Sequence, residues 1–396
     1  MPNISERGRI MPSSPIRKLV PYADAAKRDG VKVYHLNIGQ PDLPTPQKAL
    51  DAVKSIDRKI LEYSPSDGYL SLRKKLSEYY SRCGIRVNPD QILVTTGGSE
   101  ALLLTFMACL DQGDELITVE PGYANYLSFA QEAGVNVRTV TSRIEDNFAL
   151  PSAEAFEAAI TPRTRAILLG NPNNPTGCLY SKEELLSLRD IVLKYNLFLI
   201  SDEAYREFCY TDEPYLSSLQ LEGLEEHVVM VDSFSKRYSE CGIRIGNIVT
   251  RNQAVVDTIM KYAQARLSPP LLGQIVAEAS IDGTEDYQRK CYEEYIARRD
   301  FIIAGLNAIP GVYSPMPYGA FYTVASLPVE DAEDFCQWLL TDFRYKGETV
   351  MMAPAAGFYS TPGLGKNQVR IAYVLKKEDL AKALVILKKA LETYPR

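Results

Sequence analysis

Residues 166–202 read AILLGNPNNPTGCLYSKEELLSLRDIVLKYNLFLISD and contain two short apolar runs separated by a turn and a helical pattern. The runs Ala166–Leu169 and Phe198–Asp202 have the length and composition of strands that are buried on both faces. Between them, Ser181 and Glu184 form the pattern of a capping box, in which each side chain bonds the other residue's backbone amide. The segment therefore predicts a strand, a helix and a strand, the unit from which parallel sheets are built.

The same alternation continues on both sides of this segment. The other strands that we expect are Ile92–Thr96, Glu115–Val119, Val135–Val140, Val228–Ser233 and Arg244–Val249, of which the last is expected to run antiparallel. We therefore expect an α/β fold in which helices flank a mostly parallel central sheet.

The chain has 396 residues, which is more than one compact core usually holds, so we expect two domains. We assign residues 49–285 to a large domain with the central sheet. Residues 1–48 are rich in proline and show no long periodic element, whereas residues 286–396 predict a long helix, a hairpin region and a C-terminal helix from Lys377. We expect both ends to form a smaller α+β domain with an N-terminal arm.

Composition excludes several classes of protein. The net charge is −6, so we expect no general affinity for nucleic acid or for anionic membranes. We find no signal peptide and no apolar run long enough to span a membrane, and the seven cysteines are dispersed without a Cys-x-x-Cys motif. The two histidines, His35 and His227, are too few for a His-rich zinc site. We therefore expect a cytoplasmic protein with reduced thiols and no metal site.

A glycine turn, Gly97-Gly98-Ser99-Glu100, follows the expected strand Ile92–Thr96 and opens an apolar helix. Free backbone amides at a helix N-terminus, with the Ser99 hydroxyl beside them, can bind a phosphate group. The same residues can also form an ordinary helix start with Ser99 as the N-cap. The local sequence leaves both interpretations open.

Asp202 and Lys236 end two neighbouring expected strands, so both would lie at the edge of the sheet where open α/β sheets bind ligands. A buried carboxylate at this edge is costly unless a cation pairs with it. An Asp202–Lys236 salt bridge is one interpretation. In the other, Lys236 is an amine that traps a carbonyl compound, a reaction that the nearby cations Arg237 and Arg244 would favour.

Several motifs follow one another along the chain. They are Asn171-Pro-Asn-Asn-Pro-Thr-Gly177, Asp202 with Tyr205, Ser233-Phe-Ser-Lys236, and Gly242-Ile-Arg244-Ile-Gly246. In this combination the chain resembles the fold-type I, pyridoxal-phosphate-dependent class I/II aminotransferases, and most closely their aspartate and broad-specificity branch. The resemblance extends from Asn37-Ile-Gly39-Gln-Pro-Asp42 to Val369-Arg370.

The resemblance implies that the large domain binds pyridoxal 5'-phosphate. Lys236 would form an internal aldimine with this cofactor and would then move the proton during catalysis. Asp202 would pair with the ring nitrogen, while Asn174 and Tyr205 would bond the phenolic oxygen. Tyr123 would stack on the ring, at a position where much of the family has tryptophan. The implied catalytic residues are thus Lys236, Asp202 and Tyr205.

The resemblance also implies how the phosphate and the substrate are bound. The residues expected at the phosphate are Gly98, Ser99, Glu100, Ser233, Ser235 and Arg244, with Glu100 contributing only its backbone. Tyr63 would reach the phosphate of the neighbouring subunit, so that the active unit would be a homodimer with composite sites. Arg370 would hold the substrate α-carboxylate with two parallel hydrogen bonds. The implied substrate-binding residues are Gly39, Tyr123, Asn174 and Arg370, and the arm Pro12–Arg17 would act as a lid.

We therefore expect a transaminase that moves an amino group between an L-amino acid and 2-oxoglutarate by a ping-pong mechanism. Aspartate is the first candidate for the donor, and Arg17 and Arg266 are candidates for binding a distal carboxylate. A β-lyase or a decarboxylase on the same fold is an alternative. A ligand-sensing domain of a transcription regulator is a third, which the short proline-rich segment 1–48 and the presence of Lys236 disfavour. The expected partners are small amino acids and 2-oxo acids.

Overall fold

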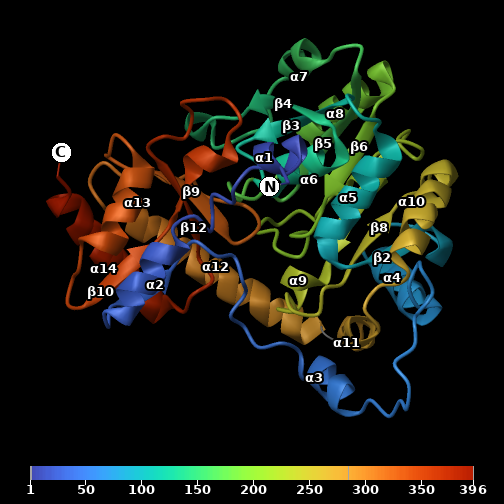
Figure 1. The fold of residues 1–396 in the computed structure, drawn as a ribbon, viewed down its shortest axis with the longest axis horizontal. Coiled ribbons are helices and arrows are strands. Elements are labelled where there is room, and N and C mark those ends of the chain that lie inside the picture. The colour runs from blue at the N-terminus through green and yellow to red at the C-terminus, as the bar shows by residue number, and fades with distance from the viewer. Residues whose placement is uncertain (1, 284, 396) are drawn as a thin grey trace.

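The computed structural model describes residues 2–283 and 285–395, which form three β-sheets with helices around them (Figure 1). The largest sheet has seven strands, in the order β2 (Ile92–Thr95), β8 (Gly246–Val249), β7 (Val228–Ser233), β6 (Phe198–Asp202), β5 (Thr164–Gly170), β3 (Glu115–Glu120) and β4 (Asn136–Thr141). Only β8 runs antiparallel to its neighbours. The predicted α/β fold and the predicted antiparallel direction of the last strand are confirmed.

Helices cover both faces of this sheet, because successive apolar side chains of each buried strand point to opposite faces. On β5, for example, Leu168 packs into one hydrophobic core and Leu169 into the other. One face is covered by α4 (Leu70–Arg82), α7 (Ala153–Ala159), α8 (Lys182–Tyr195) and α11 (Leu271–Ile281). The other is covered by α5 (Gly97–Cys109), α6 (Asn125–Ala133) and α10 (Gln253–Arg266).

Helix α8 begins where the capping box predicts. The Ser181 hydroxyl accepts a hydrogen bond of 3.2 Å from the Glu184 amide, and the Glu184 carboxylate accepts one of 2.6 Å from the Ser181 amide. The buried face of the helix consists of Leu185, Leu188, Ile191 and Val192.

Two smaller sheets lie beside the central one (Figure 1). In the first, β1 (Lys32–His35) pairs in parallel with β10 (Glu348–Met351). In the second, β12 (Gln368–Ala372) lies between β11 (Ala353–Pro354) and β9 (Tyr322–Ser326), with both pairs antiparallel. Strands β1, β9, β10 and β12 share a hydrophobic core with α2 (Val20–Arg28), α12 (Glu285–Asn307), α13 (Ala332–Thr341) and α14 (Lys377–Thr393), and Tyr205 and Phe208 from the segment after β6 also pack into it.

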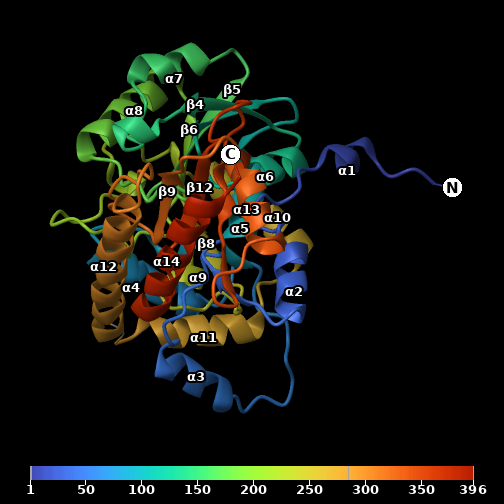
Figure 2. The same ribbon diagram turned by 90° about the vertical axis from the view of Figure 1, so that its left-hand side faces the viewer.

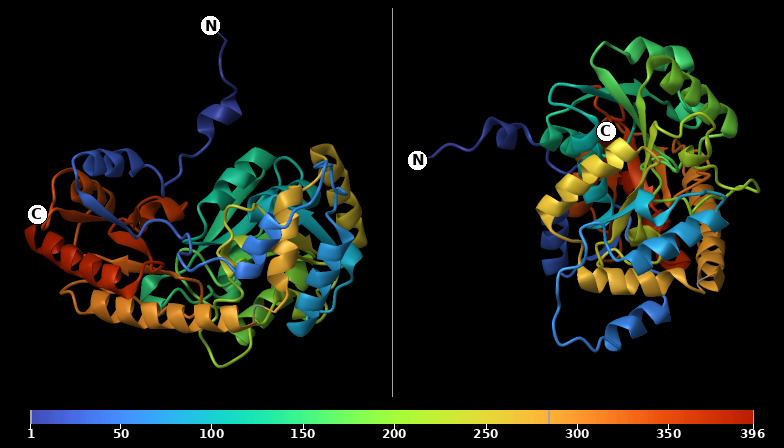
Figure 3. Two further views of the ribbon diagram at one scale, coloured as in Figure 1. Left: turned by 90° about the horizontal axis from the view of Figure 1, so that it is seen from below. Right: turned by 90° about the vertical axis from the view of Figure 1, so that its right-hand side faces the viewer.

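The first 48 residues contain more regular structure than we predicted. They include α1 (Glu6–Ile10), α2 and β1, and α3 (Gln47–Lys54) begins at their end. Helix α2 has only nine residues and buries only Ala23 and Ala26, so its sequence carries little apolar periodicity. The segment with α1 projects from the rest of the molecule, whereas α3 lies against α11 (Figures 2 and 3).

The remaining elements are short. They are α9 (Phe234–Arg237) and the 3-10 helices Pro89–Gln91, Ile144–Asp146, Ser218–Gln220 and Ala355–Phe358. None of the helices in the described ranges is both long and apolar enough to cross a membrane.

Candidate active site

A cavity of about 480 Å³ lies at the ends of β5, β6 and β7, on the side of the central sheet that faces the small sheets. Its size suits a small-molecule ligand. It also lies where ligands bind in open α/β sheets, at the carboxyl ends of parallel strands. The predicted site residues that line it are Gly39, Gly98, Ser99, Tyr123, Asn174, Asp202, Tyr205, Ser233, Ser235, Lys236, Arg244 and Arg370.

Two predicted site residues do not line the cavity. The carboxylate of Glu100 turns back to accept a hydrogen bond of 2.7 Å from the Thr96 amide, and it lies 3.3 Å from Nε of Arg266. Only the backbone of Glu100 can therefore serve a ligand there. Tyr63 is 77% exposed, so its role toward a neighbouring subunit stays a prediction. Of the two arginines proposed for a distal carboxylate, Arg17 lines the cavity, while Arg266 is held by Glu100.

The N-terminus of α5 forms the most donor-rich end of the cavity. The helix begins at Gly97 with Thr96 as its N-cap residue, so the interpretation of Ser99 as the N-cap is wrong. Gly97 has a φ of +77°, and a Cβ atom there would lie 2.4 Å from Nη2 of Arg244. The close approach of Arg244 therefore requires glycine at this position. Free helix amides, the hydroxyls of Ser99, Ser233 and Ser235, and a guanidinium together suit a phosphate dianion.

Lys236 lies in the short helix α9, and its Nζ donates a hydrogen bond of 2.9 Å to the carbonyl of Gly39. Asp202 instead accepts hydrogen bonds from the Tyr126 hydroxyl at 2.8 Å and from the Ala204 amide at 3.2 Å. These two described side chains thus do not form the salt bridge that we considered. Burial raises the pKa of Asp202, and its two hydrogen bonds oppose that shift.

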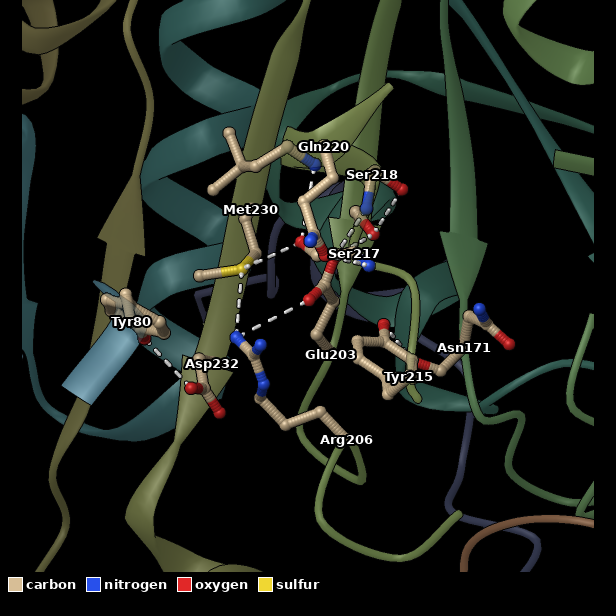
Figure 4. Close-up of polar contacts among 12 residues, drawn as sticks. Tyr80, Asn171, Glu203, Arg206, Tyr215, Ser217, Ser218, Gln220, Met230 and Asp232 are labelled. Atoms are coloured by element: carbon tan, nitrogen blue, oxygen red, sulfur yellow. Dashed lines mark hydrogen bonds and ion pairs between the residues drawn. The ribbon is translucent and has the colours of Figure 1, made fainter. Parts of the chain in front are cut away.

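The chain segment that carries Asp202 and Tyr205 is fixed by polar contacts of Glu203, a residue that does not line the cavity (Figure 4). The fully buried Glu203 lies 3.6 Å from Nη1 of Arg206. Burial raises the pKa of Glu203, while Arg206 and the hydrogen bonds lower it. Oε1 of Glu203 accepts hydrogen bonds from Ser201 Oγ at 3.0 Å, Ser217 Oγ at 2.8 Å and the Ser218 amide at 3.0 Å. The segment is therefore held by polar contacts that do not use the cavity.

A second buried ion pair fixes the turn that carries Lys236. Arg237 pairs with Asp232, which also accepts a hydrogen bond of 2.8 Å from the Tyr80 hydroxyl. The Arg237 guanidinium lies 4.3 Å from the ring centroid of Tyr79 on α4. We expected Arg237 to be a cation beside Lys236, and this expectation is wrong because Arg237 points to the opposite side. Of the two cations that we expected beside Lys236, Arg244 is the one that lines the cavity.

Arg370, on β12, is 1% exposed and lines the cavity. Its Nη1 donates to Oδ1 of Asn174 at 3.2 Å, and its Nη2 donates to the carbonyl of Asn37. Its Nε has no hydrogen-bond partner among the described residues. Burial lowers the pKa of Arg370 because it disfavours the charged form. A carboxylate in the cavity would supply the charge and the acceptor that this guanidinium lacks.

The sequence analysis missed two tyrosines of the site. Tyr126 is the donor to Asp202; it lies in the first turn of α6, and its ring packs edge-on against that of Tyr123, which precedes the helix. Tyr322 comes from β9, and its hydroxyl lies 2.8 Å from that of Tyr205. No motif surrounds Tyr322, so only the tertiary structure reveals it. Ser14 and Ile16 of the N-terminal arm and Cys241 also line the cavity.

Comparison with known proteins gives consistent matches. The family description "aminotransferase class I and II" matches residues 31–387. An aspartate aminotransferase of Pyrococcus horikoshii is 31% identical over 395 residues, covering 98% of this chain and 97% of the relative. A structure of a mutant aspartate aminotransferase of Thermus thermophilus has a TM-score of 0.90 at 30% identity, and a structure of an alanine aminotransferase of Pyrococcus furiosus has the same values. Each match covers 98% of this chain and 100% of the chain in the solved structure.

Proposed function

Since this chain belongs to the class I and II aminotransferases, we propose that it moves an amino group between an L-amino acid, with aspartate as the first candidate, and 2-oxoglutarate. It is a transaminase of a family that uses pyridoxal 5'-phosphate. The observation that carries the proposal is one cavity that brings together Lys236, Asp202 and Arg370 from distant parts of the chain. Aspartate is the substrate named for the relative from Pyrococcus horikoshii, whereas the similar structure from Pyrococcus furiosus is an alanine aminotransferase.

We propose that the residues lining the cavity hold the cofactor in one orientation. When bound, pyridoxal phosphate supplies an electron sink that stabilises negative charge at the substrate α-carbon. Asp202 would accept a hydrogen bond from the protonated ring nitrogen, which is the cation that this partly buried carboxylate needs. Tyr205 and Asn174 would donate to the phenolic oxygen, and Tyr123 would stack on the ring. The phosphate would be held by Gly98, Ser99, the backbone of Glu100, Ser233, Ser235 and Arg244.

The substrate would be oriented by Arg370 and Gly39. Arg370 would grip the α-carboxylate with its planar fork. Nζ of Lys236 donates a hydrogen bond to the carbonyl of Gly39. Since Gly39 would orient the substrate, this amine would lie beside the substrate α-carbon. We propose that this amine removes the proton from the substrate α-carbon and then donates it to the cofactor. The arm residues Ser14, Ile16 and Arg17, which line the cavity, would exclude water from it.

We also propose a cytoplasmic homodimer in which Tyr63 completes the phosphate site of the other subunit. Tyr63 lies in a stretch with two exposed apolar residues, Ile60 at 74% and Leu61 at 62% exposure, which supports a contact surface there. The seven free cysteines fit a reducing compartment. The separate hydrophobic cores support a division into residues 49–285 and a smaller domain of residues 1–48 and 286–396. Sedimentation of the wild type and of Tyr63→Ala tests the dimer and its contact.

Borohydride reduction of the protein loaded with pyridoxal phosphate tests the proposal directly. Peptide mapping should find the label on Lys236, and Lys236→Ala should bind the cofactor without retaining it after reduction. Addition of aspartate should bleach the visible band and release oxaloacetate, and 2-oxoglutarate should restore the band. Label on another lysine would contradict the assignment. Release of ammonia or carbon dioxide without a second substrate would indicate a lyase or a decarboxylase instead.

A further inference from the structure

The hydroxyl of Tyr322 connects groups from three distant parts of the chain. It lies 2.8 Å from the hydroxyl of Tyr205 and 3.5 Å from the carbonyl oxygen of Gly39. That carbonyl is also the acceptor for Nζ of Lys236. Tyr322 is on β9, whereas Tyr205 follows β6 of the central sheet. One side chain of a small sheet thus contacts two of the segments that build the site.

The surroundings of Tyr322 hold its ring in one place. A Cβ atom at position 39 would lie 1.7 Å from the Tyr322 hydroxyl oxygen, so this hydroxyl occupies space that only glycine leaves open. On the ring itself, the Arg370 guanidinium lies 4.7 Å from the centroid. The ring of Tyr205 packs edge-on at 5.5 Å. Tyr322 is 2% exposed, and this packing leaves its hydroxyl little freedom to move.

The contacts favour Tyr322 as the donor in its bond to Tyr205. A tyrosine hydroxyl has one proton to donate. The carbonyl of Gly39 is the more distant acceptor, and it already accepts a hydrogen bond from Lys236. The positive charge of Arg370 over the ring makes the Tyr322 hydroxyl a better donor. If Tyr322 donates, Tyr205 keeps its own proton for a partner in the cavity.

We propose that Tyr322 is a positioning residue that donates a hydrogen bond to Tyr205 and so directs the Tyr205 proton at the phenolic oxygen of the bound cofactor. The role rests on the proposed function, because it requires pyridoxal phosphate in the cavity with this oxygen beside Tyr205. A donor to that oxygen competes with the proton on the cofactor nitrogen that is linked to Lys236. It therefore lowers the pKa of that nitrogen, and each hydrogen bond that strengthens the donor lowers it further.

Titration of the visible absorbance of the loaded enzyme, without substrate, measures this pKa. Tyr322→Phe removes the hydroxyl and keeps the ring, and it should raise the pKa by about 0.5–1 unit, the effect of one hydrogen bond. Tyr205→Phe should raise the pKa more. In the Tyr205→Phe background, Tyr322→Phe should have no further effect, because Tyr322 acts through Tyr205.

Two further variants make the test specific. Tyr373→Phe removes a buried hydroxyl that donates a hydrogen bond to the carbonyl of Ala320, two residues before Tyr322. Neither Tyr373 nor Ala320 lines the cavity, so this variant should leave the pKa unchanged. Gly39→Ala should displace the Tyr322 hydroxyl without removing it, so it should raise the pKa even if Tyr322→Phe does not fold.

The outcomes separate this role from the proposed function. A wild type with a visible band and an unchanged pKa in Tyr322→Phe would overturn the role of Tyr322 alone. Tyr322→Phe could also shift the pKa equally in the wild-type and the Tyr205→Phe backgrounds. That result would overturn the role too, because it would show that Tyr322 acts independently of Tyr205. A wild type that forms no visible band with pyridoxal phosphate would overturn the proposed function and this role with it.

Discussion

Tyr126 donates a hydrogen bond of 2.8 Å to Oδ2 of Asp202, and this bond comes from the helix that follows Tyr123. Asp202 is partly buried, and burial raises its pKa because it disfavours the carboxylate. The Tyr126 hydroxyl opposes that shift and holds one oxygen in place. In the proposed function, the Tyr126 hydroxyl thus favours the carboxylate form of Asp202 and orients it toward the ring nitrogen of the cofactor.

Tyr126→Phe should therefore weaken cofactor binding, and more so at low pH. Loss of the donor raises the pKa of Asp202 further, so the carboxylate becomes protonated at a higher pH than in the wild type and no longer attracts a protonated ring. We expect about a tenfold increase in the dissociation constant of pyridoxal phosphate, the effect of one hydrogen bond to a charged group. Fluorescence titration of the apoenzyme at several pH values measures it. An equal increase at every pH would contradict the explanation through Asp202.

Arg370→Ala should impair the binding of every α-amino acid alike. Arg370 is buried with an unpartnered Nε, and in the proposed function it binds the carboxylate that all these substrates share. Loss of a buried charge partner costs about 2–5 kcal/mol, so KM should rise roughly 30-fold or more while the dissociation constant of pyridoxal phosphate changes little. Arg370→Lys keeps the charge without the planar fork and should recover only part of the loss. A KM that rises for aspartate but not for alanine would assign Arg370 to the distal carboxylate instead.

Local sequence predicted the central sheet and the sheet edge that carries Asp202, because both depend on short, contiguous patterns, whereas cavity residues such as Tyr123 and Arg370 were predicted through the family resemblance. The strands are runs of buried apolar residues; Asp202 ends β6, and Lys236 lies in the short helix that directly follows β7. The direction of a side chain was harder to predict. Lys236 and Arg237 are adjacent in a helix of four residues, too short for a periodic pattern, so their opposite directions follow from the Asp232 ion pair behind the turn.

Residues that reach the site by tertiary packing could not be predicted. Tyr322 comes from a small sheet, in a chain with 25 tyrosines. Its neighbours in sequence give no sign that its hydroxyl meets that of Tyr205. Arg17 was only one of two candidates until packing of the N-terminal arm placed it at the cavity. The sequence patterns thus do not determine which distant segments come into contact.

Ser181→Ala should reduce the free energy of unfolding by about 1 kcal/mol through loss of the N-cap of α8. Glu184→Ala should cost more, because the Glu184 carboxylate also accepts a hydrogen bond of 2.6 Å from the Leu150 amide. Urea denaturation measures both. Ser187→Ala, at an exposed position of the same helix, is the matched control and should be neutral or slightly stabilising. A Ser181→Ala variant as stable as the wild type would show that water replaces the cap.

Glu240→Gln should stabilise the protein at alkaline pH and have little effect at acid pH. Glu240 is 3% exposed, its Oε1 accepts a hydrogen bond from Ser280, and its Oε2 has no hydrogen-bond partner among the described residues. Burial raises its pKa from 4.5 to about 8. The folded state therefore holds this proton more tightly than the unfolded state. The stability that Glu240 contributes is complete below about pH 4.5 and is lost as the pH rises toward 8.

Glutamine stays neutral and can keep the bond to Ser280, so the variant should escape that loss. The difference in unfolding free energy between Glu240→Gln and the wild type should grow from near zero at about pH 4.5 to roughly 2–5 kcal/mol at about pH 8, since each pKa unit corresponds to about 1.4 kcal/mol. Urea midpoints across this range measure it, with Glu222→Gln at an exposed position as the control. A constant difference at every pH would show that Glu240 has the same pKa in the folded and the unfolded protein, because stability depends on pH only where the two states bind different numbers of protons.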